Sequence, residues 1–159
     1  MRGALAMIAV AVLAGGALSG CASLWGASKD QASIDFDRET KADDLKVRED
    51  QTRSDLGRIE AAIADYYKTN NAIPKRLDLL IPKFLAAIPP LEVPECGKET
   101  TEVEYYPPEV LRGGQVDGTR LRGSGRWGYV FNGRRVVIFV DCLKRSTSGV
   151  PWYQVRGVY

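Results

Sequence analysis

The absence of histidine limits the chemistry that this chain can perform. Its 159 residues include three cysteines but no histidine. Catalytic triads that use histidine, and acid–base chemistry by imidazole, are therefore excluded. Metal sites also lose a common ligand, so the sequence predicts no metal and no other cofactor. Carboxylates, hydroxyls and thiols remain as candidates.

The hydroxyl with the most suggestive setting is Ser124, which lies between Gly123 and Gly125. An exposed nucleophile of this kind needs a strand–turn–helix setting and a base, and the sequence shows neither around Ser124. The nearby glycines also lack the Gly-Lys-Ser/Thr order of a phosphate-binding loop.

Two carboxylates, Asp141 and Glu109, keep one enzymatic alternative open. Glycosidases need only a pair of carboxyl groups, so a carboxylate-dependent hydrolase of envelope glycans does not require histidine. Acidic residues are also frequent between positions 29 and 65, where they alternate with basic ones as on a solvated surface. We expect binding rather than turnover, and therefore no enzyme.

The first cysteine, Cys21, follows a segment typical of secretion. Arg2 supplies a positive start, residues 4–17 are small or apolar and uncharged, and Leu18-Ser19-Gly20 precedes the cysteine. The apolar run is too short to span a bilayer comfortably, which predicts a cleaved signal peptide over residues 1–20. Leu-Ser-Gly-Cys resembles the bacterial lipobox, in which the cysteine is acylated and becomes the new N-terminus. An ordinary signal with a chance cysteine is the alternative.

The lipobox resemblance implies a lipoprotein whose anchor is Cys21, carrying several acyl chains of the palmitate kind. Each buried CH₂ contributes roughly 0.8 kcal/mol, so several chains give durable anchoring in membrane lipid. Enteric bacteria use Asp after the cysteine to retain lipoproteins in the inner membrane. Ala22 stands there in this chain, which favours the outer membrane with the domain facing the periplasm.

An oxidising compartment would leave Cys96 and Cys142 to form a structural disulfide. Their spacing fits neither a CxxC redox site nor a zinc knuckle. On the chain-entropy model a bridge closing this loop stabilises the fold by about 4 kcal/mol. Two buried free thiols are the alternative.

Removing the signal peptide leaves 139 residues, enough for one domain and too few for two. Residues 21–41 have few apolar side chains and no sustained period, so we expect a lipidated flexible tether that spans about 25 Å as a coil. Lys41–Arg53 reads as a solvated helix or a frayed extension, weakly supported by a Glu49–Arg53 pair. Thr52 or Ser54 is expected to cap the packed part of the helix. The domain itself is expected over residues 42–159.

The packed helix should present one apolar face made by Leu56, Ile59, Ile63, Tyr66 and Tyr67. Asn tolerates the left-handed conformation that closes a helix, so Asn70 or Asn71 is the expected C-cap. Pro74 suits the first turn of a short helix to Leu80, followed by a further turn from Pro82. Leu77, Leu80 and Ile81 are expected to face inward.

Strands are expected at Glu102–Tyr106, in a hairpin between positions 126 and 142, and at Pro151–Tyr159. Asn132-Gly133 favours a two-residue type I′ turn, which would oppose Tyr129 to Val136 and Trp127 to Ile138. Trp127, Tyr129, Val136, Ile138 and Val140 would then share the face that packs on the helix. Residues 111–125 carry five glycines and are expected to form a mobile loop. The fold class is α+β, with an N-terminal helix packed on a C-terminal antiparallel meander.

The order of residues at the end of the helix resembles the junction in type IV pilins and type II secretion pseudopilins. The matching residues are Ala61, Ala64, Tyr66, Tyr67, Asn70, Pro74, Leu77, Leu80, Leu85 and Pro89. Asn71-Ala72 replaces the usual Asn-Gly, and Ile73 replaces an aromatic residue. The apolar rod that pilins carry upstream, beginning Gly-Phe-Thr-Leu-Ile-Glu, is absent. The resemblance therefore implies the globular half of a pilin only. Some pseudopilins hold calcium in a loop before the last strands, so the resemblance also makes Asp117, next to Gly118, a candidate calcium ligand, although the cluster of oxygen ligands that calcium requires is not visible in the sequence.

Charge is divided unevenly along the chain. Residues 22–106 hold 12 basic and 17 acidic side chains, a net charge of −5, whereas residues 107–159 hold 9 and 3, a net charge of +6. Near-neutrality overall argues against nucleic acid as a partner. The asymmetry is explained either by a basic sheet lying on an acidic helix or by a surface for an anionic partner.

The loop arginines Arg120, Arg122 and Arg126 are the candidate contacts for an envelope protein or an anionic cell-wall partner. Together these patterns predict a membrane-anchored periplasmic lipoprotein that binds or scaffolds within an envelope, type II secretion or pilus-like assembly.

Overall fold

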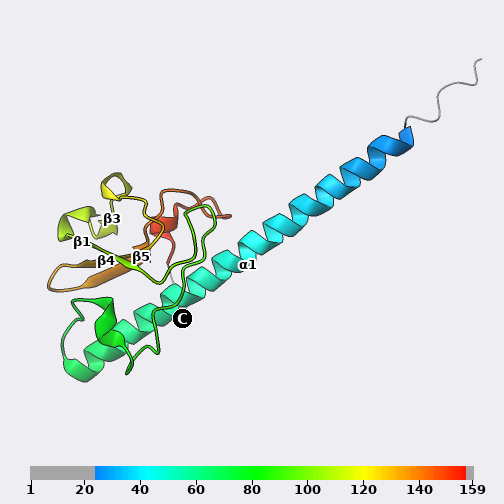
Figure 1. Cartoon of the computed structure of the whole chain (residues 1–159). Helices are drawn as coiled ribbons and strands as arrows, with labels where there is room; N and C mark the ends of the chain where they lie inside the picture. The colour runs from blue at the N-terminus through cyan, green and yellow to red at the C-terminus, as the bar shows by residue number, and fades with distance from the viewer. Residues whose placement is uncertain (1–23, 157–159) are drawn as a thin grey trace, which may run out of the picture. The chain divides into compact units, whose positions relative to one another are not determined.

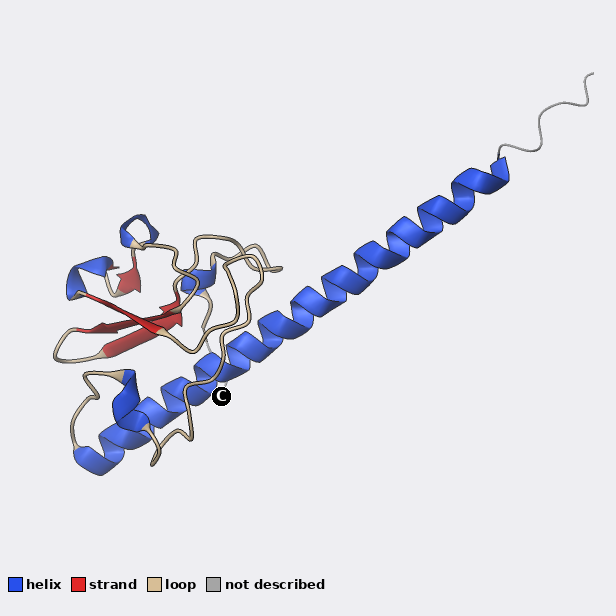
Figure 2. Cartoon of the chain, viewed as in Figure 1, coloured by secondary structure: helices blue, strands red, loops and turns tan. Residues whose placement is uncertain are grey.

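The computed structural model describes residues 24–156, with side chains described from Ser33 onward. The predicted signal peptide and Cys21 lie outside the described residues. The chain divides into two units, one before Thr40 and one from Thr40 onward. The elements follow in the order α1 (Leu24–Asn70), η1 (Leu77–Leu80), β1 (Val103–Tyr106), η2 (Pro108–Val110), β2 (Leu111–Arg112), β3 (Gln115–Val116), η3 (Gly118–Arg120), β4 (Trp127–Phe131), β5 (Val136–Val140) and η4 (Trp152–Gln154), where η denotes a 3₁₀ turn (Figures 1 and 2). The predicted α+β class is confirmed.

Helix α1 begins much earlier than the sequence pattern suggests. The coil expected for the tether is wrong from Leu24 onward. Thr52 and Ser54 both lie within the helix, where Thr52 is buried, so neither caps it. Residues 24–41 contain no proline and a single glycine, so their intrinsic propensity permits a helix even without an apolar face to bury. Lack of periodicity therefore indicated a solvated segment and not a coil. The role of this segment as a membrane tether stays a prediction.

The end of α1 is closed as expected. Asn71 adopts φ = 49°, in the left-handed region, and its N–H donates to the Tyr67 carbonyl at 2.8 Å. The short helix predicted from Pro74 is the 3₁₀ turn η1, in which Leu77 and Leu80 are buried. Ile81 is exposed, so the prediction that it faces inward is wrong.

The three-stranded sheet has the order β1-β4-β5, with β4 and β5 antiparallel. β1 pairs with β4 in parallel, from Val103 opposite Trp127 onward, so the all-antiparallel meander is wrong at this strand. Residues 107–126 cross over and return the chain to the beginning of β1, which forces the parallel direction. The predicted last strand is also wrong over its described part, because Trp152–Gln154 form η4, and Trp152 and the following Val155 bury their side chains.

The β4–β5 hairpin closes with a longer loop than the Asn-Gly signal suggests. Phe131 opposes Val136 and Tyr129 opposes Ile138, so residues 132–135 form a four-residue loop. Asn132 Oδ1 accepts hydrogen bonds from the N–H groups of Arg134 and Arg135, at 3.1 and 2.9 Å. The predicted register is therefore off by two residues. Because side chains alternate with a period of two, the predicted inward face is unaffected and is confirmed.

This inward face meets α1 in the main core. The core joins α1, η1, the segment after it, the sheet and η4 through Leu56, Ile59, Leu77, Leu80, Leu91, Trp127, Tyr129, Ile138, Val140 and Trp152. Buried aromatic polar atoms also bind the segment after α1. Trp127 Nε1 donates to the Pro89 carbonyl at 2.8 Å, and the Tyr129 hydroxyl donates to the Pro74 carbonyl at 2.6 Å. Sheet and α1 are thus fixed to one another from Leu56 to Ala62.

A buried carboxylate extends this attachment toward the N-terminal side. Glu49 is 3% exposed, and its side chain accepts hydrogen bonds from the backbone and hydroxyl of Thr147. Its other oxygen accepts from Arg53 Nη2 at 2.6 Å, which confirms the predicted Glu49–Arg53 pair. Burial alone would raise the pKa of Glu49, but the hydrogen bonds from Thr147 and Arg53 outweigh it and hold the pKa below its ordinary value.

We expect Glu49→Gln to make stability less dependent on pH in the acid range. A carboxyl whose pKa is lowered by folding stabilises the native state above its unfolded pKa, near 4.5, and loses that contribution as pH falls through its folded pKa. The difference in unfolding free energy between wild type and E49Q should therefore be larger at pH 6 than at pH 3, as measured by urea denaturation. The exposed neighbour supplies a control, Asp50→Asn. Parallel pH profiles for wild type and E49Q would contradict this role.

Candidate functional site

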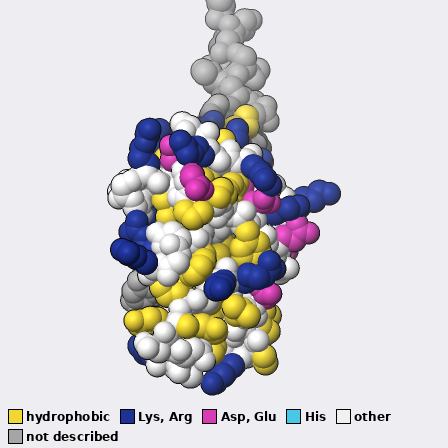
Figure 3. All heavy atoms as spheres, turned by 90° about the vertical axis from the view of Figure 1, so that its left-hand side faces the viewer, with side chains coloured by type: hydrophobic (Ala, Val, Ile, Leu, Met, Phe, Trp, Pro, Cys, Tyr) yellow, Lys and Arg dark blue, Asp and Glu magenta, His cyan; other side chains and the backbone are white. Residues whose placement is uncertain are grey.

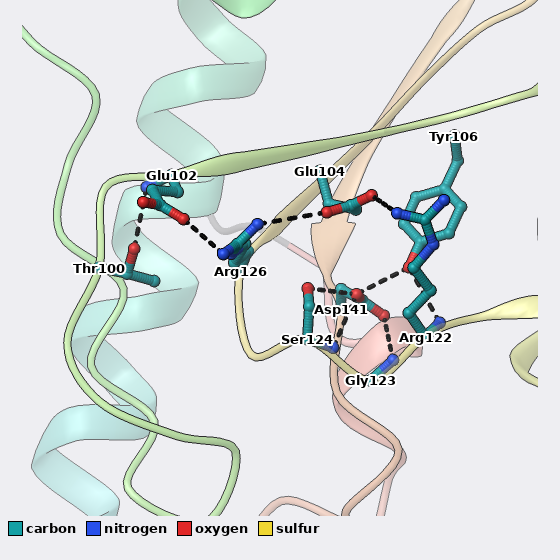
Figure 4. A network of polar contacts seen from close by, with 9 residues as sticks. All are labelled: Thr100, Glu102, Glu104, Tyr106, Arg122, Gly123, Ser124, Arg126 and Asp141. Carbon is teal, nitrogen blue, oxygen red and sulfur yellow. Dashed lines mark hydrogen bonds and ion pairs between the residues drawn. The ribbon is translucent and has the colours of Figure 1, made fainter.

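Two of the predicted partner-binding arginines meet around one carboxylate. Arg122 and Arg126 both pair with Glu104, and Arg126 Nη2 also lies 2.8 Å from a carboxylate oxygen of Glu102 (Figure 4). Both glutamates lie at or next to β1, which the parallel crossover brings beside the start of β4. The positive charge of these arginines is therefore largely matched within the domain.

Arg120 lies apart from this pair, at the end of η3. Its guanidinium donates to the Glu109 carbonyl at 2.8 Å and lies 3.8 Å from a carboxylate oxygen of Asp117. Asp117 itself caps η3, because its Oδ1 accepts from the backbone and hydroxyl of Thr119. These hydrogen bonds lower the pKa of Asp117. The carboxylate of Asp117, the candidate calcium ligand, thus stabilises the start of a 3₁₀ turn.

The segment expected to be a mobile loop has a defined conformation. Gly113 and Gly114, at φ = 59° and 88°, form the turn of the β2–β3 hairpin. Two adjacent glycines between short extended segments are typical of a hairpin turn, whereas the number of glycines alone suggested a loop. The following residues are held by Asp141, so the prediction of a mobile loop over residues 111–125 is wrong.

Asp141 is the centre of a buried polar network behind the arginines (Figure 4). Its side chain is 0% exposed and accepts four hydrogen bonds: from Gly123 N at 3.0 Å, Ser124 N at 2.9 Å, Ser124 Oγ at 2.5 Å and the Tyr106 hydroxyl at 2.7 Å. Burial raises the pKa of Tyr106 to about 12, so its hydroxyl stays a donor at neutral pH. All of these contacts position the loop.

In this geometry, the residues considered as candidates for hydrolysis make structural hydrogen bonds. Asp141 accepts hydrogen bonds through both oxygens, and the carboxylate that accepts from the Ser124 hydroxyl is also occupied by the Tyr106 hydroxyl and the N–H groups of the loop. Glu109 is exposed on η2, and its backbone carbonyl receives Arg120. Asp141 and Glu109 therefore have different surroundings, and nothing in their contacts favours the glycan-hydrolase alternative.

A groove that sequence reasoning did not identify runs between the end of α1 and β5. Two adjoining hollows of ≈ 670 and ≈ 320 Å³ share the side chains of Ile63, Tyr67 and Val136. Tyr67 is 51% exposed here, so the prediction that it faces the core is wrong. The sheet ends at β5 and leaves this part of the apolar helix face uncovered by the described residues. The helical period finds the apolar face, but only the position of the sheet edge shows how much of it is covered.

Basic side chains surround the larger hollow. Lys75, Arg134 and Arg135 line it and are exposed, and no ion pair involves them within the part of the chain that the structure describes. Figure 3 shows this end of the molecule, where hydrophobic and basic side chains are interspersed. The excess positive charge of residues 107–159 is thus available at the hairpin loop, whereas Arg122 and Arg126 are paired.

Within residues 24–156, no helix combines the length and the apolar character needed to cross a membrane.

Of the cysteines with a predicted role, only the disulfide pair can be located in the structure. Cys21 lies outside the described residues, whereas Cys96 and Cys142 lie at disulfide distance with their Cα atoms 5.6 Å apart. Comparison of the chain with protein-family models, curated proteins and solved structures finds no match.

Proposed function

We propose that this chain is a lipoprotein, acylated at Cys21 and facing the periplasm from the outer membrane, that binds or scaffolds other proteins in an envelope assembly. The observation that carries the binding role is the groove between α1 and β5. It combines uncovered apolar side chains, such as Tyr67, with basic side chains that have no acidic partner among the described residues. Such a mixed surface suits protein contacts.

We further propose that the domain is pilin-like and belongs to a type II secretion or pilus-like assembly. The order of a long helix, an Asn cap, a proline-started turn and a small sheet supports this, together with the junction residues. Two features depart from the expectation. β1 is parallel to β4, and η4 occupies the described part of the predicted last strand.

The anchor is tested by metabolic labelling with an alkyne analogue of palmitate in the source bacterium. Wild-type protein should incorporate the label and fractionate with the outer membrane, whereas Cys21→Ser should lose both properties. A Cys96→Ala/Cys142→Ala variant controls for labelling of the other thiols. Unlabelled wild-type protein in the soluble periplasmic fraction would contradict the lipoprotein assignment.

The binding role is tested by a photo-crosslinking amino acid placed at Tyr67 in living cells. We expect a discrete adduct with an envelope protein, which should weaken when Cys21→Ser releases the domain from the membrane. Leu79 is a matched control, because it is similarly exposed and does not line the groove. Equal adducts from both positions, or none from Tyr67, would argue against a partner at this site.

A further inference from the structure

The outer edge of β5 carries backbone groups without partners. Asp141 N donates to the Arg126 carbonyl at 2.9 Å, and Asn132 N donates to the Arg135 carbonyl at 3.2 Å. Antiparallel pairing alternates, so every second residue between these points directs its backbone toward β4. Val136 and Ile138 therefore direct their N–H and C=O groups outward, and no hydrogen bond from residues 24–156 reaches them. This is a free edge able to accept another strand.

An added strand would lie beside the apolar groove. Ile63, Ala64 and Tyr67 of α1 line the smaller hollow together with Val136 and Ile138. Alternate side chains of a strand paired with β5 point to the same face as these two β5 residues, toward α1. Apolar side chains at those positions would cover the exposed ring of Tyr67. Backbone pairing and side-chain burial are thus available to the same extended segment.

The charge of the groove selects the kind of segment. Lys75, Arg134 and Arg135 line the larger hollow, which has no acidic lining residue, and Arg156 lines the smaller one beside Glu60. Four basic side chains thus face one carboxylate. Acidic side chains that alternate with the apolar ones would point to the opposite face of the sheet, toward which the Arg135 guanidinium extends beside Gly114, and so would bring charge of the missing sign to the hairpin loop.

We infer that β5 and the groove bind an extended segment of a partner protein, apolar and acidic in alternation, as an additional strand of the sheet. This inference rests on the proposed binding role and specifies the chemistry of the partner. Main-chain hydrogen bonds to Val136 and Ile138 supply much of the affinity, and the basic side chains that line the groove select acidic sequences.

Peptide binding to the full-length protein in detergent micelles tests this inference. The probe is a fluorescent nine-residue peptide that alternates valine and glutamate, compared by anisotropy with one in which lysine replaces every glutamate. We expect at least about tenfold tighter binding of the glutamate peptide, weakening as salt is added. Methylation of alternate amide nitrogens, on the edge that faces β5, should abolish binding. Equal binding of the glutamate, lysine and methylated peptides would overturn the inference.

Two pairs of variants separate backbone pairing from charge. Val136→Pro removes one outward N–H, whereas Val136→Ala reduces the side chain and keeps that donor, so only the proline variant should lose most of the binding. Arg134→Glu/Arg135→Glu should weaken glutamate-peptide binding about tenfold or more. Lys98→Glu/Lys144→Glu reverses the same number of exposed charges outside the groove and should leave it unchanged. Equal losses within either pair would overturn the inference.

The result remains distinguishable from failure of the binding role itself. An envelope adduct from Tyr67 without glutamate-peptide binding would overturn strand addition while leaving the proposed function supported. A Tyr67 adduct only to residues 157–159 of the same chain would show that the chain fills its own groove, and would overturn both. Peptide binding that depends on Val136 and on the hairpin arginines supports the inference.

Discussion

Replacing Asp141 with alanine should lower the free energy of unfolding by about 3 to 5 kcal/mol, because the change strands several buried donors at once. Gly123 N, Ser124 N and the Tyr106 hydroxyl all donate to this carboxylate. Each buried donor left without an acceptor costs roughly 1–3 kcal/mol, and relaxation of the loop toward water recovers part of the total. Urea denaturation of the oxidised protein, followed by circular dichroism, measures the change.

Two graded variants accompany Asp141→Ala. Asp141→Asn keeps the shape and one acceptor oxygen, so its destabilisation should be intermediate. Ser124→Ala removes a single donor from the edge of the network and should lower stability by about 1 kcal/mol. A loss below 1 kcal/mol for Asp141→Ala would show that the loop does not depend on this carboxylate.

Removal of the Cys96–Cys142 bridge has the second-largest expected effect. The cysteines are separated by 46 positions in the sequence. For a loop of that length the chain-entropy model gives a stabilisation of about 4 kcal/mol, since the bridge restricts the unfolded chain. We therefore expect Cys96→Ala/Cys142→Ala to unfold at markedly lower urea concentration than the oxidised wild type.

The reduced wild-type protein separates the bridge from the packing of the cysteines. Cys142 is buried in the core, so the alanine variant also loses some apolar contact. Wild type in excess reductant should fall between the oxidised protein and the double-alanine variant. Identical denaturation curves with and without reductant would contradict a stabilising bridge.

Periodicity predicted the core faces well because burial follows local geometry. The helix face from Leu56 to Tyr66 and the hairpin face from Trp127 to Val140 both pack as expected. The hairpin face was predicted correctly despite a register error of two residues, because side chains alternate between the two faces and a shift by two leaves each on the same face. Loop length itself depended on Asn132, whose side chain accepts two backbone N–H groups and so stabilises a longer turn than Asn-Gly implies.

What the sequence could not supply is the set of contacts between distant segments. The parallel pairing of β1 with β4 places Glu104 beside Arg122 and Arg126, 18 and 22 positions away, and so matches the charges predicted to bind a partner. Local patterns do not encode that pairing. Arg134 and Arg135, at the hairpin loop, remain without acidic partners among the described residues, in which no strand follows β5.

The parallel pairing has a consequence for how the chain reaches its fold. Hairpin β4–β5 joins residues that are close in sequence, whereas pairing Val103 with Trp127 requires the whole crossover to close first. Closing a long loop costs chain entropy before any stabilising contact forms, and this lowers the folding rate. The hairpin should therefore form early and β1 should dock late. A newly synthesised chain would then expose both edges of β4–β5 for a time, and its susceptibility to mispairing would be greatest in that interval.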